Sequence, residues 1–306
     1  MNKETISVKG LTRYYGKKKA VDQLDLDIQE GCVFGLLGRN GAGKSSAIRM
    51  LLGLLEPTRG SSSILGENSL EFTPETRAKI GYMAEGHPVH GWMKVAECAR
   101  FQSSFYPSWN DKAFRSIIGH FNIDPDTRAG SLSRGERAGL NLALTMAPDP
   151  KVLVLDDPAL GLDPMARRML IEVLVSLMRR GDRTILFSSH LLSDVERVAD
   201  RIGVIEDGIL RACCTVEYFC EQVWRIVGVF ESNAPDTPPV PGLLNSRRSG
   251  KELAITVANH GADAMQKLRD MGAHSVERVP LSLEDAFISY IRERGELCLD
   301  GIADKE

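Results

Sequence analysis

The chain has 306 residues and a formal net charge of −3, from 38 Lys and Arg against 41 Asp and Glu. Single hydrophobic cores stop growing near ~250 to 300 residues, so this length predicts two domains. The near balance of charge argues against a nucleic-acid partner, which would need a strongly basic surface. No apolar run has the length of a signal peptide core or a membrane span, which predicts a cytoplasmic chain. Six cysteines with no metal-site spacing predict free thiols in a reducing compartment: Cys32, Cys98, Cys213, Cys214, Cys220 and Cys298.

The first part of the chain, residues 1–220, reads as one α/β domain. From Ile6 to about Glu217, short aliphatic runs alternate with longer helical patterns, which predicts a mainly parallel sheet covered by helices. The clearest strands are compact apolar runs, as expected of strands that are buried on both faces. They cover residues 33–37, 152–155, 184–187 and 201–205.

Strand patterns vanish between about residues 86 and 150, which predicts a helical subdomain inserted into the α/β domain. Its expected helices cover residues 94–105, 111–121 and 133–147. The proline-rich stretch 232–242 reads as a linker or long turn. Residues 225–306 are expected to form a small C-terminal domain, with a strand at 253–257 and helices at 262–271 and 283–293.

The segment FGLLGRNGAGKSS, residues 34–46, follows a predicted strand and precedes a helical pattern, which is the context of a phosphate loop. Its glycines would let backbone amides converge on phosphate oxygens, and the helix would add its positive end. Lys44 would neutralise the β and γ phosphates, and the Ser45 hydroxyl would bind Mg²⁺. A glycine turn without a ligand is the alternative, yet a chance match has odds of roughly one in a hundred. The predicted ATP-binding residues are Gly38, Asn40, Gly41, Gly43, Lys44, Ser45 and Ser46.

Two carboxylates end the buried run KVLVLDD, residues 151–157. Alone, this pair of carboxylates would indicate a solvated turn. With the phosphate loop upstream, it predicts a metal-binding and catalytic site. Adjacent strand residues point to opposite sides, so the two carboxylates need different roles. We expect Asp156 to hold Mg²⁺ and Asp157 to orient the attacking water.

Five motifs in a fixed order, GRNGAGKS, LSRGE, VLVLDD, GLD and SSH, resemble the ATPases of ATP-binding cassette (ABC) transporters over roughly Ile6 to Glu217. The resemblance implies a P-loop NTPase fold with a helical subdomain insertion and a small C-terminal α+β module. It also implies ATP hydrolysis with Mg²⁺. Ser133 and Gly135 of LSRGE would contact the γ phosphate of a nucleotide held by the opposite protomer. Ser133 is also a good N-cap, so a capped helix with no ligand is the alternative reading of this motif.

The same resemblance implies further roles along the chain. Tyr15 would stack on adenine, with Tyr14 as the second choice. His190 would be the switch histidine that senses the γ phosphate, and Asp163 would communicate between protomers. Glu85, where many relatives have glutamine, would bind the metal ion. The implied metal ligands are Ser45, Asp156 and Glu85.

Two residues depart from the family pattern. Asp157 stands where most members have the longer glutamate, which could slow hydrolysis because general-base assistance is worth about 10² to 10⁴ in rate. Arg134 replaces a signature glycine, and it either adds a phosphate contact or crowds the backbone.

The resemblance implies a homodimer or heterodimer of ATP-binding subunits that closes around ATP and drives a separately encoded membrane permease. The transporter implied by the resemblance is an exporter. The chain would then sit on the inner face of the cell membrane, with residues 86–100 as the docking surface. Two alternatives stay open: a soluble ABC ATPase without a permease, and a regulatory subunit that hydrolyses ATP slowly. For the C-terminal domain, a regulatory or dimer-stabilising role is only a hypothesis.

Overall fold

The computed structural model describes residues 4–178, 181 and 183–292, so Cys298 lies outside the described residues. The chain divides into two compact units, Met1–Leu210 and Arg211–Glu306. The sequence places this boundary between residues 220 and 225, whereas the structure divides the chain within strand β10 (Ile209–Thr215). Within the described ranges, no helix is both long and apolar enough to cross a bilayer.

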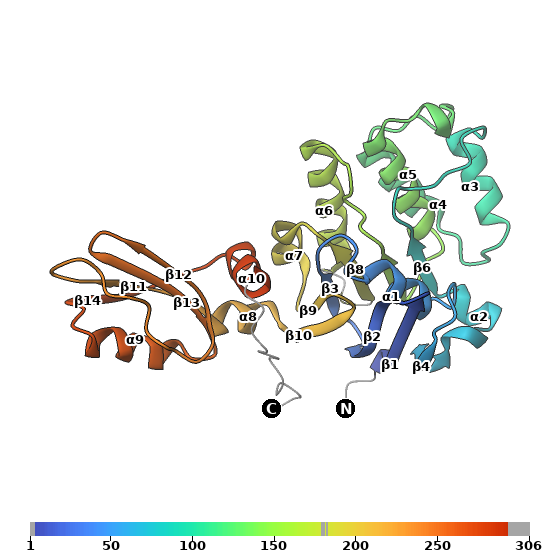
Figure 1. Cartoon of the computed structure of the whole chain (residues 1–306). Helices are drawn as coiled ribbons and strands as arrows, with labels where there is room; N and C mark the ends of the chain where they lie inside the picture. The colour runs from blue at the N-terminus through green and yellow to red at the C-terminus, as the bar shows by residue number, and fades with distance from the viewer. Residues whose placement is uncertain (1–3, 179–180, 182, 293–306) are drawn as a thin grey trace. The chain divides into compact units, whose positions relative to one another are not determined.

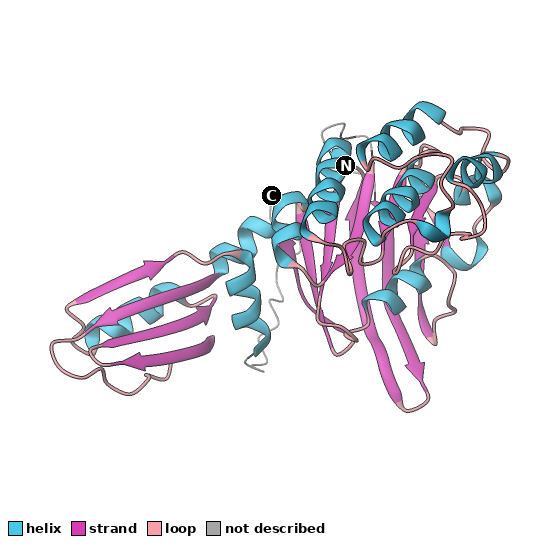
Figure 2. Cartoon of the chain, turned by 90° about the horizontal axis from the view of Figure 1, so that it is seen from above, coloured by secondary structure: helices cyan, strands magenta, loops and turns pink. Residues whose placement is uncertain are grey.

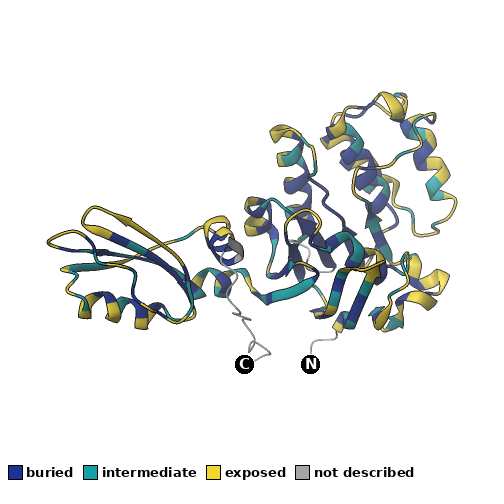
Figure 3. Cartoon of the chain, viewed as in Figure 1, coloured by how far each residue is buried: buried dark blue, intermediate teal, exposed yellow. Residues whose placement is uncertain are grey.

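A parallel sheet with the strand order β9-β3-β8-β7-β6 forms the centre of the first unit. Its strands are buried almost throughout because they are apolar on both faces, as Figure 3 shows in dark blue. The four strands expected from the sequence are confirmed, and β6 is added. The bounds are β3 (Val33–Leu37), β6 (Ile80–Met83), β7 (Val152–Leu155), β8 (Thr184–Ser189) and β9 (Arg201–Glu206).

A second, antiparallel sheet in this unit has the order β2-β1-β4-β5 and was missed by the sequence analysis, which expected a mainly parallel arrangement. Its strands are buried on one face only, so they alternate between apolar and polar residues. Helix α1 (Lys44–Leu51) packs against β1, β2 and β4. The bounds are β1 (Glu4–Tyr15), β2 (Lys18–Gln29), β4 (Arg59–Ile64), β5 (Glu67–Asn68), η1 (Ser69–Glu71) and α2 (Pro74–Arg77).

The predicted helical subdomain is present and contains α3 (Val95–Ser103), α4 (Asp111–His120), η2 (Ala129–Ser131) and α5 (Arg134–Met146), which gather at the upper right of Figure 1. Helix α5 packs against α3, α4 and β6, which connects the subdomain to the parallel sheet. Two further helices, α6 (Pro164–Met178) and α7 (Leu192–Val198), pack against each other.

The second unit contains an antiparallel sheet with the order β12-β13-β11-β14. The predicted strand and two helices are found, and the stretch 232–242 is irregular as expected. The sequence analysis missed the other three strands, two of which, β12 and β14, are largely polar and exposed and so lack a compact apolar run. The bounds are α8 (Val216–Gln222), β11 (Val223–Val229), β12 (Leu243–Ser249), β13 (Glu252–Ala258), α9 (Gly261–Asp270), β14 (Ser275–Val279) and α10 (Leu283–Arg292).

Candidate functional site

The loop between β3 and α1 has a backbone that only glycine fits at two positions. A Cβ atom on Gly38 would lie 2.4 Å from the Ile205 carbonyl oxygen. Gly43 has a φ of 110°, and a Cβ there would lie 2.3 Å from the Ala20 carbonyl oxygen. No side chain caps α1, so its first amides remain available to an anion. The geometry is therefore that of a phosphate-binding loop.

Lys44 begins α1 and turns back over this loop. Its ammonium group donates hydrogen bonds to the carbonyl oxygens of Gly38 at 2.7 Å and Arg39 at 3.2 Å. The side chain is buried, and burial lowers the pKa of Lys44 below its usual value, against the opposing charges of nearby carboxylates. A phosphate would strongly stabilise a buried ammonium group that is held only by carbonyl oxygens, because the phosphate supplies the opposite charge.

Asp156 follows β7 and is joined to the phosphate loop. The Ser45 hydroxyl donates to Asp156 Oδ1 at 3.0 Å, and the Ser188 hydroxyl, at the end of the neighbouring strand β8, donates to the same oxygen at 2.8 Å. Asp156 is fully buried, yet its Oδ2 atom has no hydrogen-bond partner among the described residues. A buried carboxylate oxygen without a partner is costly, and a cation would satisfy it.

Asp157 is paired with His190, which follows β8. His190 Nδ1 lies 2.8 Å from Asp157 Oδ2, and the backbone amide of Asp157 donates to the Ser188 hydroxyl at 2.9 Å. Burial raises the pKa of Asp157, whereas the hydrogen bond and charge of His190 oppose that rise. Asp157 Oδ1 is buried and has no partner within the described part of the chain. This oxygen is free to accept a hydrogen bond from a water molecule.

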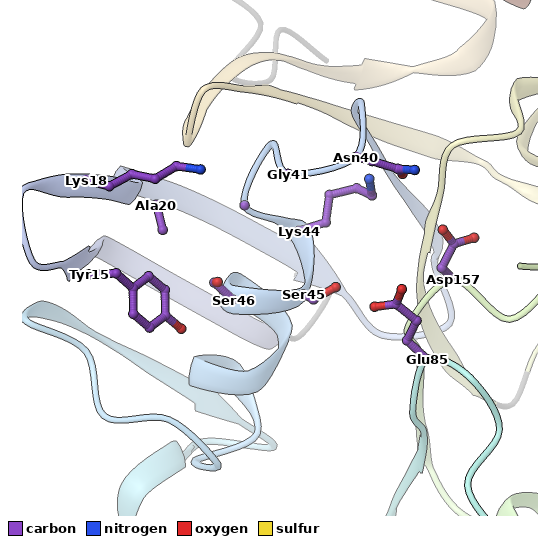
Figure 4. A pocket seen from close by; sticks show the side chains of 11 residues that line it. Tyr15, Lys18, Ala20, Asn40, Gly41, Lys44, Ser45, Ser46, Glu85 and Asp157 are labelled. Carbon is purple, nitrogen blue, oxygen red and sulfur yellow. The ribbon is translucent and has the colours of Figure 1, made fainter.

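Lys44, Ser45 and Asp157 line a pocket of about 380 Å³, whereas Gly38, Asp156 and His190 lie outside its lining. Figure 4 shows Tyr15 at one end of the pocket, Glu85 and Asp157 at the other, and Lys44 between them. The structure therefore brings together most of the residues that the sequence predicted. The lining residues are Tyr15, Lys18, Ala20, Asn40, Gly41, Gly43, Lys44, Ser45, Ser46, Glu85 and Asp157.

The two predicted aromatic candidates for adenine are not equivalent. Tyr15 lines the pocket and is 47% exposed, and the guanidinium carbon of Arg13 lies 5.1 Å from its ring centroid. Tyr14 does not line the pocket, and the ammonium group of Lys19 lies 5.7 Å from its ring centroid. The geometry therefore favours Tyr15.

The signature residues do not line this pocket. Ser133 caps α5: its hydroxyl accepts from the Glu136 amide at 3.2 Å, and its own amide donates to Glu136 Oε2 at 2.8 Å. A Cβ on Gly135 would lie 2.6 Å from the Ala166 side chain, so α5 approaches α6 closely there.

Two other predicted residues have structural partners near the signature motif. Asp163 Oδ1 accepts from the amides of Met165 at 2.9 Å and Ala166 at 3.0 Å, so it caps α6. Arg134 extends toward the loop before Asp163, because a Cβ on Gly161 would lie 3.2 Å from its Nη1 atom. Arg134 therefore packs against this loop within its own chain.

Sequence reasoning missed three residues that shape the site. Ser188 contacts both Asp156 and Asp157, and Lys18 lines the pocket near Tyr15. His87 is buried, and its Nε2 donates to the Pro158 carbonyl at 2.9 Å, which joins the loop after β6 to the loop after Asp157. Burial lowers the pKa of His87, so the neutral ring is favoured. The SSH motif contained a signal for Ser188, but nothing in the sequence distinguished His87.

The loop, the buried lysine and the two carboxylates that follow β7 define a P-loop nucleoside triphosphatase. The model of the family described as "ABC transporter" matches residues 21–160. The bacitracin transport ATP-binding protein BcrA of Bacillus licheniformis is 33% identical over 207 residues, which cover 67% of this chain and 68% of the relative. Nod factor export ATP-binding protein I of Rhizobium sp. (strain N33) is 30% identical, and the match covers 94% of this chain and 97% of that protein. The chain belongs to the ABC transporter family, as an ATP-binding subunit with ATPase activity.

Solved structures agree with this fold. The ATP-binding subunit of an ABC transporter superposes with a TM-score of 0.63 at 24% identity, covering 71% of this chain and 92% of that one. A dimeric cassette in a post-hydrolysis state, bound to ADP and Pi, gives a TM-score of 0.62 at 19% identity, covering 69% and 98% of the two chains. At these identities, the structural matches support the fold alone.

Proposed function

We propose that this chain hydrolyses Mg·ATP for an exporter whose permease is a separate membrane protein. One observation carries the proposal: Asp156 and Asp157 each keep one buried carboxylate oxygen without a partner among the described residues, beside the phosphate loop. The names of two relatives, for bacitracin transport and Nod factor export, support the transport role.

The residues present fit a magnesium ion. Mg²⁺ prefers oxygen ligands and keeps several waters, so it needs few protein groups. Among the described residues, no cluster of three His, Cys, Asp or Glu side chains could hold a metal ion by itself, so substrate phosphates would supply the remaining ligands. Ser45 and Asp156 would hold the ion, with Glu85 at the pocket wall as a third ligand. When bound, the ion would neutralise charge on the phosphates.

Lys44 and the loop amides bind the phosphates, while Asp157 orients the attacking water through its unpartnered oxygen. His190 holds the other oxygen of Asp157 and thereby fixes the orientation of the carboxylate. Tyr15 covers the adenine at the opposite end of the pocket.

Two subunits, alike or different, would close around ATP, because Ser133 and Gly135 do not line the pocket of their own chain. The free amides at the start of α5 would meet the γ phosphate that the opposite chain holds. Hydrolysis would then separate the negative charges of ADP and phosphate, which would open the interface between the two subunits.

The permease would dock on a hollow of about 440 Å³ in the helical subdomain, lined in part by Val89, His90 and Phe101. Two large apolar side chains stand exposed beside it: Trp92 is 69% exposed and Phe105 is 64% exposed. Exposed aromatic side chains of this size mark interaction surfaces. Docking there would place the chain at the inner face of the membrane.

Asp157→Asn separates ATP binding from hydrolysis. We expect the variant to bind Mg·ATP and to accumulate as an ATP-bound dimer, because the amide cannot act as a base. Turnover should fall by about 10² to 10⁴. A variant that hydrolyses ATP as fast as the parent would refute the role of Asp157.

Slow, regulatory hydrolysis is the second candidate, favoured by the short side chain of Asp157 at the catalytic position. If side-chain reach limits the parent, Asp157→Glu should raise turnover. Unchanged or lower turnover in that variant would reject this alternative.

A further inference from the structure

Two buried residues near the catalytic carboxylates have a backbone conformation that is unfavourable for their side chains. Asp157 has a φ of 44° and His87 has a φ of 53°, both in the left-handed region that favours glycine. His87 is also followed by Pro88, and a proline pushes the residue before it toward an extended backbone. Such conformations are costly and persist only where the surrounding contacts hold them.

The two strained residues lie in adjoining connections. Strands β6 and β7 are neighbouring and parallel, and Met83 pairs with Leu155 in their register. The connections that follow these strands therefore leave the sheet at the same edge, and connections of this kind are pink in Figure 2. His87 Nε2 lies 2.9 Å from the carbonyl oxygen of Pro158, the residue directly after Asp157. One side chain therefore spans the gap between the two connections.

The proton of this hydrogen bond belongs to the histidine, because a carbonyl oxygen can only accept. Burial lowers the pKa of His87, so the neutral ring is favoured, and its single proton is on Nε2. Both His87 and Pro158 are buried. A hydrogen bond that is shielded from bulk water in this way is stronger than an exposed one.

The contact with His87 is one of two that hold the backbone around Asp157. On one side, the Asp157 amide donates to the Ser188 hydroxyl at 2.9 Å. On the other side, His87 donates to the Pro158 carbonyl. One bond fixes the peptide group before Asp157 and the other fixes the peptide group after Pro158. The strained catalytic residue therefore lies between two fixed points.

His87 can serve as a fixed point because its own loop is anchored. The Asn141 side chain, on α5, donates to the Pro88 carbonyl at 2.8 Å. The His87 amide donates to the Ala84 carbonyl at 3.3 Å. His87 does not line the ATP pocket, so its effect on the reaction would pass through the residues that it holds.

We propose that His87 is a positioning residue for ATP hydrolysis, which holds the Pro158 carbonyl and thereby keeps the Asp157 carboxylate aimed at the attacking water. This inference rests on the proposed role of Asp157 as the group that orients the water. Misplacing a reacting group by about 1 Å can cost about a hundredfold in rate. Loss of the His87 contact should therefore lower kcat and leave ATP binding unchanged.

The test compares His87→Gln with His87→Met in the full chain. Both new side chains are unbranched and of similar length, and both meet the same backbone strain, but only glutamine offers an N–H donor in place of Nε2. Turnover at saturating Mg·ATP, counted per ATP-binding site from calorimetry, should fall about tenfold to a hundredfold in His87→Met. His87→Gln should recover most of the parental turnover, and both variants should bind ATP like the parent.

The Asp157→Asn background separates positioning from a general loss of stability. If His87 acts through Asp157, adding His87→Met should not slow the residual hydrolysis of Asp157→Asn any further. An equal loss in both backgrounds would overturn the proposal and assign His87 a structural role, or one through Glu85 two residues away. Parental turnover in His87→Met would overturn it as well. Parental turnover in Asp157→Asn would instead refute the role of Asp157, and the proposal with it.

Hydrogen exchange of the nucleotide-free chains gives a readout that does not depend on catalysis. The amides of residues 157–163 should exchange about tenfold faster in His87→Met than in His87→Gln, because only the methionine variant frees the Pro158 carbonyl. The amides of β7 and β8 should stay equally protected in both variants. Equal exchange of residues 157–163 in the two variants would contradict the proposal.

Discussion

Ser188 is the residue whose removal should test the geometry of the catalytic corner most sharply. Its buried hydroxyl donates to Asp156 Oδ1 at 2.8 Å and accepts from the Asp157 amide at 2.9 Å. Losing a hydrogen bond to a charged group costs about 1.5 to 3 kcal/mol, and leaving a buried amide unsatisfied costs about 1 to 3 kcal/mol. The two losses are not independent, so we expect Ser188→Ala to lower the free energy of unfolding by about 2 to 4 kcal/mol.

The same substitution should slow hydrolysis, because Asp157 adopts a left-handed backbone with a φ of 44° that the hydrogen bond to Ser188 helps to hold. Misplacing a reacting group by a fraction of an ångström is sufficient for a loss of about tenfold to a hundredfold. Urea unfolding without nucleotide would measure the stability, and steady-state phosphate release at saturating Mg·ATP would measure turnover.

Ser189→Ala provides the control. Ser189 is equally buried, but among the described residues its hydroxyl contacts only Leu191, whose amide donates to it at 2.9 Å. This variant should lose stability and keep the turnover of the parent. A Ser188→Ala protein that loses less than about 1 kcal/mol and hydrolyses ATP at the parental rate would refute the reasoning.

Three further predictions follow from the pocket. In urea unfolding of the nucleotide-free chain, Gly43→Ala should lower the free energy of unfolding by about 2 kcal/mol or more beyond Gly41→Ala. Both glycines have a positive φ, but only at Gly43 would a Cβ atom clash with a carbonyl oxygen. Equal losses of stability in the two variants would contradict the clash. Tyr15→Ala should weaken ATP binding in calorimetry by about tenfold while Tyr14→Ala leaves it unchanged, and the reverse order would assign the adenine to Tyr14. Burial raises the pKa of Asp157, so its contribution to stability is present below its unfolded value and is lost as pH rises through its folded value. Asp157→Asn should therefore raise the thermal midpoint of the nucleotide-free chain at neutral pH, and this gain should shrink toward about pH 4. A gain that is independent of pH would show that the ionisation of Asp157 is not its cause.

The site could be predicted largely from the sequence because its residues follow buried strands. Asp156 and Asp157 follow β7 and His190 follows β8, and parallel strands bring their carboxyl ends to one edge of the sheet. The spacing of the glycines in the phosphate loop determines the path of its backbone, and this path fixes the positions of Lys44 and Ser45. The position of these residues along the chain was therefore sufficient to predict that they meet.

The features that the sequence did not predict depend on contacts that leave no periodic pattern of apolar residues in the sequence. Strands of the antiparallel sheet, such as β1, contain bulges that break the alternation of apolar and polar residues. His87 contacts Pro158 across 71 positions of sequence, and such a pairing has no local signal. Strand β12 is largely polar, so its register in the sheet has no apolar alternation that would reveal it in the sequence.

Calorimetric titration of the full chain with Mg·ATP, compared with Lys44→Ala, tests the central claim most directly. We expect the parent to bind one ATP per chain in a magnesium-dependent way, and we expect the variant to bind none, because Lys44 is the buried cation at the centre of the phosphate loop. A parent that takes up no Mg·ATP, or a Lys44→Ala variant that binds it as tightly as the parent, would contradict the account.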